Sequence, residues 1–243
     1  MHAIIPAAGR GTRMAAVTRG RPKELLTLGS RTVLERVIDE AEHIGCDRIV
    51  VVNAVGKQEI DAFILDRYRE STPRVEVRYQ RAMRGLADAV ASANLTEDAV
   101  VLLGDTVVVP ESPAQRLADA VRGGAFAAVG TETVPDTEVS RYGIVEVDGS
   151  LVRRILEKPQ PTETTSRLAV ASRYALSGQA LQELASFSES WSSEREVTLS
   201  DFLAQAVDRG ERIVSVPLTD RENRIDCGTP EAYASAKDLP WWS

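Results

Sequence analysis

The feature that most constrains this fold is an alternation, in the first half of the chain, of short β-branched runs with longer segments of helical period. The strand-like runs are residues 3–8, 48–53, 74–80 and 99–103. The segments between them, residues 32–44, 57–68 and 86–94, repeat apolar side chains three and four positions apart, which is typical of amphipathic helices. Strands that alternate with helices predict βαβ units around a mainly parallel sheet, and therefore an α/β fold.

Beyond Asp105 the chain contains more strand and turn patterns. We expect strands at residues 126–134, 143–147, 151–156, 168–176 and 212–216, and helices at residues 177–185, at 198–209 and from Pro230 onward. The dipeptide Asp148-Gly149 between two of these strands is typical of a tight hairpin. No linker is long or biased enough to divide the chain, and no repeat occurs, so we expect a single domain over residues 1–243.

Charge and cysteine content narrow the classes of partner and compartment. The formal net charge of -7 opposes binding to a nucleic-acid backbone, so any phosphate ligand needs a local cluster of cations. A composition of 43% hydrophobic and 27% charged residues is typical of a globular protein without a membrane span. Cys46 and Cys227 are too few for a disulfide framework, and the N-terminus lacks a signal-peptide pattern, so we expect a cytoplasmic location.

A glycine-rich loop follows the first strand-like run. Gly9 and Gly11 allow positive φ angles, so backbone N–H groups there can approach an anion closely. Alone, such a loop is interpreted equally well as a plain turn, but Arg13 and Lys23 nearby favour phosphate binding. Met14 stands where a dinucleotide-binding fingerprint has its third glycine, and the segment after the loop does not look like a helix start, so a dehydrogenase is disfavoured.

Two aspartates are candidates for holding a metal. Asp105 follows an apolar strand, at the edge where ligands bind in open α/β sheets, and Asp226 lies in a turn before a helix that starts with Pro230. Either residue alone could be an ordinary turn or cap residue. Their occurrence with the glycine-rich loop favours a metal-assisted phosphate reaction.

The order of these motifs resembles the sugar nucleotidyltransferase family. The resemblance begins with Gly9-x-Gly11-Thr12-Arg13 and Pro22-Lys23, and runs along nearly the whole chain. It is strongest to the bacterial UTP–glucose-1-phosphate uridylyltransferases. It implies a Rossmann-like nucleotidyltransferase fold, in which a mixed, mostly parallel sheet is flanked by helices and carries a smaller β-rich sugar-binding insertion. Residues 1–105 would then bind mainly nucleotide, and residues 106–226 would bind mainly the sugar phosphate and complete the metal site.

The resemblance also implies roles for individual residues. Catalysis would fall to five of them, Arg13, Lys23, Asp105, Lys158 and Asp226, with Mg²⁺ held by the two aspartates. Nucleotide binding would use Ala7, Ala8, Gly9, Gly11, Thr12, Arg13, Lys23, Gln80 and Gly85. Sugar-phosphate binding would use Leu86, Tyr142, Gly143, Glu157, Lys158, Val170 and Tyr174. Three positions depart from the family pattern, namely Ala16, Thr106 and Ser172, so contacts near them are expected to differ.

The implied reaction joins a nucleoside triphosphate to a sugar 1-phosphate and releases pyrophosphate. UTP and glucose 1-phosphate are the expected pair. The alternatives are dTTP with glucose 1-phosphate, and CTP with another phosphate or phosphonate. A non-catalytic nucleotide-sensing subunit would be expected to have lost an aspartate or a clamp lysine, whereas Lys23, Asp105, Lys158 and Asp226 are all present. Family members commonly self-associate, so a homo-oligomer is a further expectation.

Overall fold

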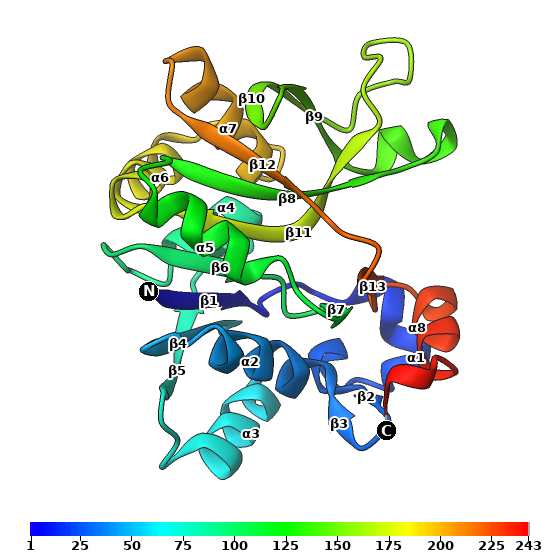
Figure 1. Cartoon of the computed structure of the whole chain (residues 1–243). Coiled ribbons are helices and arrows are strands. Elements are labelled where there is room, and N and C mark those ends of the chain that lie inside the picture. The colour runs from blue at the N-terminus through cyan, green and yellow to red at the C-terminus, as the bar shows by residue number, and fades with distance from the viewer. Residues whose placement is uncertain (243) are drawn as a thin grey trace.

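One twisted nine-stranded sheet forms the centre of the protein (Figure 1). The structure is a computed structural model, and it describes residues 1–242. The strand order is β5-β4-β1-β6-β11-β8-β12-β10-β9. Among the described residues, no helix has the length and apolar character that a membrane span requires.

The first half of the sheet has the predicted βαβ pattern. Its four strands, β1 (His2–Pro6), β4 (Arg48–Ala54), β5 (Arg74–Gln80) and β6 (Ala99–Leu102), pair in parallel around β1. They are connected through α2 (Val33–His43), α3 (Gln58–Tyr68) and α4 (Leu86–Ala91). Helix α2 begins at a capping box, in which Thr32 accepts a hydrogen bond from the Glu35 backbone and the Glu35 carboxylate accepts one from the Thr32 backbone. The predicted strands and helices are confirmed here.

The sheet separates two apolar layers. Successive side chains of a strand point to opposite faces, so Ile4 packs in one cluster while Ala3 and Ile5 pack in the other. In β4, Val50 and Val52 share the cluster of Ile4. Each fully buried aliphatic side chain of this kind contributes about 1.5–3 kcal/mol, so the strands that carry the site are rigidly held.

The second half of the sheet contains both parallel and antiparallel strand pairs. Its strands are β8 (Ala127–Thr133), β9 (Gly143–Asp148), β10 (Leu151–Glu157), β11 (Leu168–Leu176) and β12 (Ile213–Pro217). Strand β11 runs antiparallel to β6 and joins the halves, while β12 is parallel to β8. Its helices are α6 (Gly178–Ser190), α7 (Leu199–Asp208) and α8 (Pro230–Lys237). The α/β fold expected from the sequence, with a mixed sheet flanked by helices, is confirmed. Only four of the nine strand pairings that the structure describes in the sheet are parallel, so the sheet is not mostly parallel as expected.

Several elements were not predicted from the sequence. Helix α5 (Ala114–Arg122) begins directly after Pro113, where the prolines favoured a loop. Strands β7 (Thr106–Pro110) and β13 (Glu222–Asp226) form a separate antiparallel ladder, and β2 (Thr27–Leu28) pairs with β3 (Arg31–Thr32). The expectation of no helix after the glycine-rich loop was wrong, because a 3-10 turn (Thr12–Met14) leads into the single-turn helix α1 (Ala15–Thr18). Short 3-10 turns also occur at Lys23–Leu25, Asp136–Arg141 and Pro240–Trp242.

Candidate active site

A cleft of about 340 Å³ lies at the carboxyl ends of β1, β5 and β6. That volume is within the range of small-molecule sites, and the position is where open α/β sheets bind ligands. Ten of the predicted site residues line it: Ala8, Gly9, Gly11, Thr12, Arg13, Lys23, Gln80, Gly85, Leu86 and Asp105.

The glycine-rich loop forms one wall of the cleft. Gly11 has a φ of 62°, a left-handed conformation that glycine adopts without a steric cost. The loop is supported from behind by Lys57, whose Nζ donates to the Ala7 carbonyl at 2.9 Å. The side chain of Arg13 is exposed, and within residues 1–242 it makes no ion pair with a carboxylate. A cationic, glycine-lined loop of this kind is suited to binding phosphate groups.

Lys23 and Asp105 form an ion pair inside the cleft. Burial would raise the pKa of Asp105, but the charge of Lys23 and its hydrogen bond outweigh burial and lower that pKa. Burial likewise opposes the charge on Lys23, and the nearby Asp105 carboxylate reverses that effect, so its pKa is raised. Both groups are therefore charged at neutral pH.

The ladder of β7 and β13 brings Asp226 next to Asp105. Asp226 is the register partner of Thr106, and the Cys227 backbone N–H donates to the Asp105 carbonyl at 2.9 Å. A Cβ atom on Gly228 would lie 2.8 Å from Asp226 Oδ1 and 3.8 Å from Asp105 Oδ2. The glycine thus leaves a space between the two carboxylates. Burial raises the pKa of the Cys227 thiol to about 12, so this cysteine is a packing residue.

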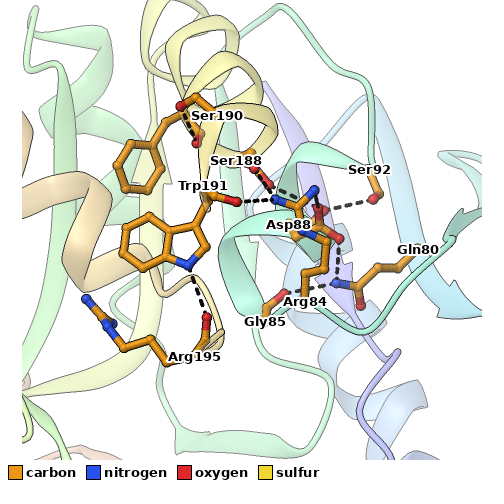
Figure 2. A network of polar contacts seen from close by, with 10 residues as sticks. Gln80, Arg84, Gly85, Asp88, Ser92, Ser188, Ser190, Trp191 and Arg195 are labelled. Carbon is orange, nitrogen blue, oxygen red and sulfur yellow. Dashed lines mark hydrogen bonds and ion pairs between the residues drawn. The ribbon is translucent and has the colours of Figure 1, made fainter. Parts of the chain in front are cut away.

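Gln80 and Gly85 form the opposite wall. Gly85 has a φ of 122°, and a Cβ atom there would lie 2.3 Å from the Val197 carbonyl oxygen, so no other residue fits. The Gln80 side-chain amide donates to the Gly85 carbonyl at 3.0 Å and to Asp88 Oδ2 at 2.8 Å (Figure 2). Gln80 is therefore held in one position at the edge of the cleft.

Comparison with known proteins identifies the family. Residues 2–239 match the family described as Nucleotidyl transferase. This chain belongs to the nucleotidyl transferase family. A UTP–glucose-1-phosphate uridylyltransferase of Bacillus subtilis is 30% identical over 93% of this chain and 84% of its own length, and one of Staphylococcus epidermidis is 28% identical over 89% and 90%. The crystal structure of a UDP-glucose pyrophosphorylase in complex with UDP-glucose superposes with a TM-score of 0.85 at 25% identity, covering 98% of both chains. A UDP-glucose pyrophosphorylase from Acinetobacter baumannii gives 0.81 at 26% identity, covering 97% and 91%.

The predicted sugar-phosphate residues of this nucleotidyl transferase form a second group. A Cβ atom on Gly143 would lie 3.4 Å from Glu157 Oε2 and 3.5 Å from Val170 Cγ2, so these three residues are neighbours. Burial, and then the charge of Glu157, raise the pKa of Tyr174, which places that phenol near the same carboxylate. Gly143, Glu157, Val170 and Tyr174 therefore lie together, and their role in binding a sugar phosphate stays a prediction.

Lys158 and Tyr142 lie at the margin of this group. Lys158 has a φ of 49°, its N–H donates to the Tyr142 carbonyl at 3.0 Å, and its exposed Nζ lies 3.4 Å from Glu157 Oε1. The guanidinium group of Arg224 stacks on the Tyr142 ring, at 4.9 Å from the ring centroid. Within residues 1–242, no hydrogen bond or ion pair joins Lys158 to the glycine-rich loop.

Residues 196–200 connect the two groups in the nucleotidyl transferase. Glu196 lines the cleft, and the Val197 N–H donates to the Arg84 carbonyl at 2.7 Å. Ser200 Oγ lies 2.6 Å from the position of a Cβ atom on Gly143. One short segment therefore contacts both the cleft and the group around Gly143.

Sequence reasoning missed several cleft residues. Arg10, Glu24, Met83, Leu103 and Gly228 also line the cleft. Glu24 is 1% exposed, burial raises the pKa of its carboxyl group, and its Oε2 lies 3.6 Å from Lys57 Nζ. The only sign in the sequence that Glu24 could belong to the site was its position directly after Lys23. A charged residue in a loop is usually exposed, so the sequence did not indicate that Glu24 is buried.

Proposed function

We propose that this nucleotidyl transferase makes UDP-glucose and pyrophosphate from UTP and glucose 1-phosphate. The observation that carries the proposal is a single cleft that combines the glycine-rich loop, Lys23 and Asp105 with a fixed Gln80. The phosphate groups and the base of the nucleotide would thus contact different walls of the cleft. The relatives of similar length named for this reaction support the same substrate pair.

The chemistry we propose is an in-line displacement at the α-phosphorus of the triphosphate. An anionic oxygen of the sugar phosphate forms the new P–O bond as the bond to the pyrophosphate oxygen breaks, so no general base is needed. Lys158 orients the attacking phosphate. Arg13 stabilises the charge that develops on the leaving pyrophosphate, and Lys23 holds the triphosphate.

The residues present fit a bound Mg²⁺. Asp105 and Asp226 supply hard oxygen ligands, which this ion prefers, and Gly228 leaves a space between them that a Cβ atom would fill. Among residues 1–242, no group of three or more His, Cys, Asp or Glu could hold a metal, so substrate and water oxygens would supply the remaining ligands. When bound, the ion would neutralise charge on the phosphate oxygens. Asp105 and Asp226 would hold it there, and Lys23 would keep the Asp105 carboxylate ionised.

A division of labour along the chain follows from this assignment. Residues 1–105 provide the nucleotide half, with the glycine-rich loop and Gln80. Residues 106–226 provide Gly143, Glu157 and Lys158 for the sugar phosphate, and end at Asp226, which completes the metal site. Segment 196–200 belongs to the second half and contacts both the cleft and the group around Gly143.

The test is pyrophosphate release with UTP, dTTP and CTP, each with glucose 1-phosphate and other sugar 1-phosphates. We expect the highest kcat/KM for UTP with glucose 1-phosphate. Asp105→Asn and Asp226→Asn are each expected to lower kcat by about 10²-fold or more, since each removes charge stabilisation at the reacting phosphates. Asp119→Asn, at an exposed site on α5, is the matched control and should leave kcat unchanged. Wild-type turnover with another nucleotide but not UTP would refute the substrate assignment, and unaltered kcat in either aspartate variant would refute its metal role.

A further inference from the structure

The side-chain amide of Gln80 has a defined orientation. Its Nε2 donates to two acceptors, the Gly85 carbonyl at 3.0 Å and Asp88 Oδ2 at 2.8 Å (Figure 2). Reversing the amide would place its oxygen against both of those acceptors, so the network fixes which atom is which. The Oε1 atom accepts no hydrogen bond within residues 1–242, and it is not sealed from solvent. Since Gln80 lines the cleft, only an acceptor remains available to a ligand.

Asp88 is itself held from the opposite side, by α6. Ser188, which is buried, donates through Oγ to Asp88 Oδ1 at 3.0 Å. Arg84 lies 3.7 Å from the same Oδ1 and also donates to the carbonyls of Ser188 and Trp191 (Figure 2). A carboxylate with both oxygens engaged by donors remains a pure acceptor. Asp88 therefore has no hydrogen to offer to Gln80, and the alternative amide orientation is excluded.

We propose that Asp88 is a specificity-determining positioning residue, which makes the cleft select a pyrimidine with a ring N–H. Uracil carries a donor at N3, which matches the free Gln80 oxygen. Cytosine carries a lone pair at N3, so the same oxygen repels it. Thymine shares the N3–H of uracil, and the network does not separate UTP from dTTP. This inference rests on the proposed use of a pyrimidine nucleoside triphosphate and adds the device that selects it.

The decisive variant is Asp88→Asn. Asparagine has nearly the same shape, but it can accept from or donate to Gln80, so only the Gly85 carbonyl still opposes the reversed amide orientation. We expect the ratio of the Kd values for CTP and UTP, measured by titration calorimetry without sugar phosphate, to fall about tenfold, the size expected for one hydrogen bond in a partly buried site. The ratio for dTTP and UTP should stay unchanged. A purely structural role for Asp88 would weaken all three nucleotides equally.

Asp61→Asn is the matched control. Asp61 accepts from the Asn53 amide at 2.9 Å and from the Tyr79 hydroxyl at 3.0 Å, so it makes the same kind of contact outside the cleft. It should lower the unfolding midpoint as much as Asp88→Asn does without changing the CTP to UTP ratio. Ser188→Ala, which leaves the Gln80 contact in place, provides a milder variant and should lower the ratio less than Asp88→Asn.

Three outcomes would overturn the inference. The first is a folded Asp88→Asn protein with an unchanged ratio of Kd values for CTP and UTP, and the second is an equal change of that ratio in Asp61→Asn. The third, if Asp88→Asn does not fold, is an unchanged ratio in Ser188→Ala. Because these measurements report binding, they are independent of turnover. A wild-type protein that binds UTP more tightly than CTP but releases no pyrophosphate would refute the proposed function, and it would leave the inferred role of Asp88 unaffected.

Discussion

Arg173 offers the most demanding test of how this fold is held together. Its guanidinium is fully buried, and it donates to Glu40 on α2 at 2.8 and 2.6 Å. It also donates to the backbone carbonyls of Thr106 at 2.9 Å and Ser172 at 3.0 Å. One side chain on β11 therefore links α2 to the residue that follows Asp105. The perturbation we consider is Arg173→Met, which keeps the aliphatic length and removes all four of these hydrogen bonds.

The magnitude follows from what the substitution leaves behind. The Glu40 side chain is only 8% exposed, so without Arg173 its carboxylate stays buried with no opposite charge and keeps only the Ser112 hydroxyl as a donor. Removing one partner of a buried ion pair costs about 3–5 kcal/mol. For a chain of this size, each kcal/mol lowers the midpoint of thermal unfolding by about 2–4 °C, so a fall of about 6–20 °C is expected.

The assay is thermal and urea unfolding of four proteins: wild type, Arg173→Met, Glu40→Leu and the double variant. The double variant should be more stable than Arg173→Met, because it no longer buries an unpaired carboxylate. Arg209→Met removes an exposed pair with Glu183 and should cost no more than about 1 kcal/mol. The reasoning fails if Arg173→Met costs as little as that surface control, or if the double variant is no more stable than the single one.

Three further predictions concern the cleft. Gly228→Ala places a methyl group 2.8 Å from Asp226 Oδ1, so it should raise the Mg²⁺ concentration for half-maximal turnover without lowering the unfolding midpoint of the metal-free protein. Gly85→Ala, at a φ of 122°, should lower that midpoint and raise the KM for UTP, whereas Gly149→Ala, in open space, should change only the midpoint. Lys23→Met removes the cation that lowers the pKa of Asp105. A carboxyl group whose pKa is lower in the folded than in the unfolded protein stabilises the fold at pH values above its unfolded pKa, and this stabilisation is lost in acid. The difference in the free energy of unfolding between wild type and Lys23→Met, measured in urea, should therefore increase from about pH 3 to pH 6. A difference that stays constant over this range would contradict the effect of Lys23 on the pKa of Asp105.

Local periodicity made the first half of the fold predictable. Strands such as Arg48–Ala54 and helices such as Val33–His43 carry their apolar pattern within themselves, so their type could be deduced without knowing their neighbours. The ladder of Thr106–Pro110 with Glu222–Asp226 could not be found this way. The second strand has a single apolar side chain, Ile225, and its pairing partner is distant along the chain.

The candidate site, like the fold, could be predicted only in part from the sequence. Motif order predicted which charged residues belong to one site, and Lys23 and Asp105 form an ion pair in the cleft. The contacts that orient those residues depend on side chains brought together by tertiary packing. Spacing alone gives no sign that Asp88 would fix the Gln80 amide, or that Lys57 would support the loop at Ala7.

The position of Asp105 explains why so much of the chain is needed for this site. Its carboxylate is paired with Lys23, which comes from the nucleotide half of the chain. Its carbonyl accepts from Cys227, which the late strand β13 carries to it, and the next residue, Thr106, is held by Arg173 from β11. Three distant segments therefore converge on one short turn after β6. Because each contact is short and partly buried, displacement of any segment shifts the proposed metal ligand, and the site is complete only when both halves of the sheet are joined.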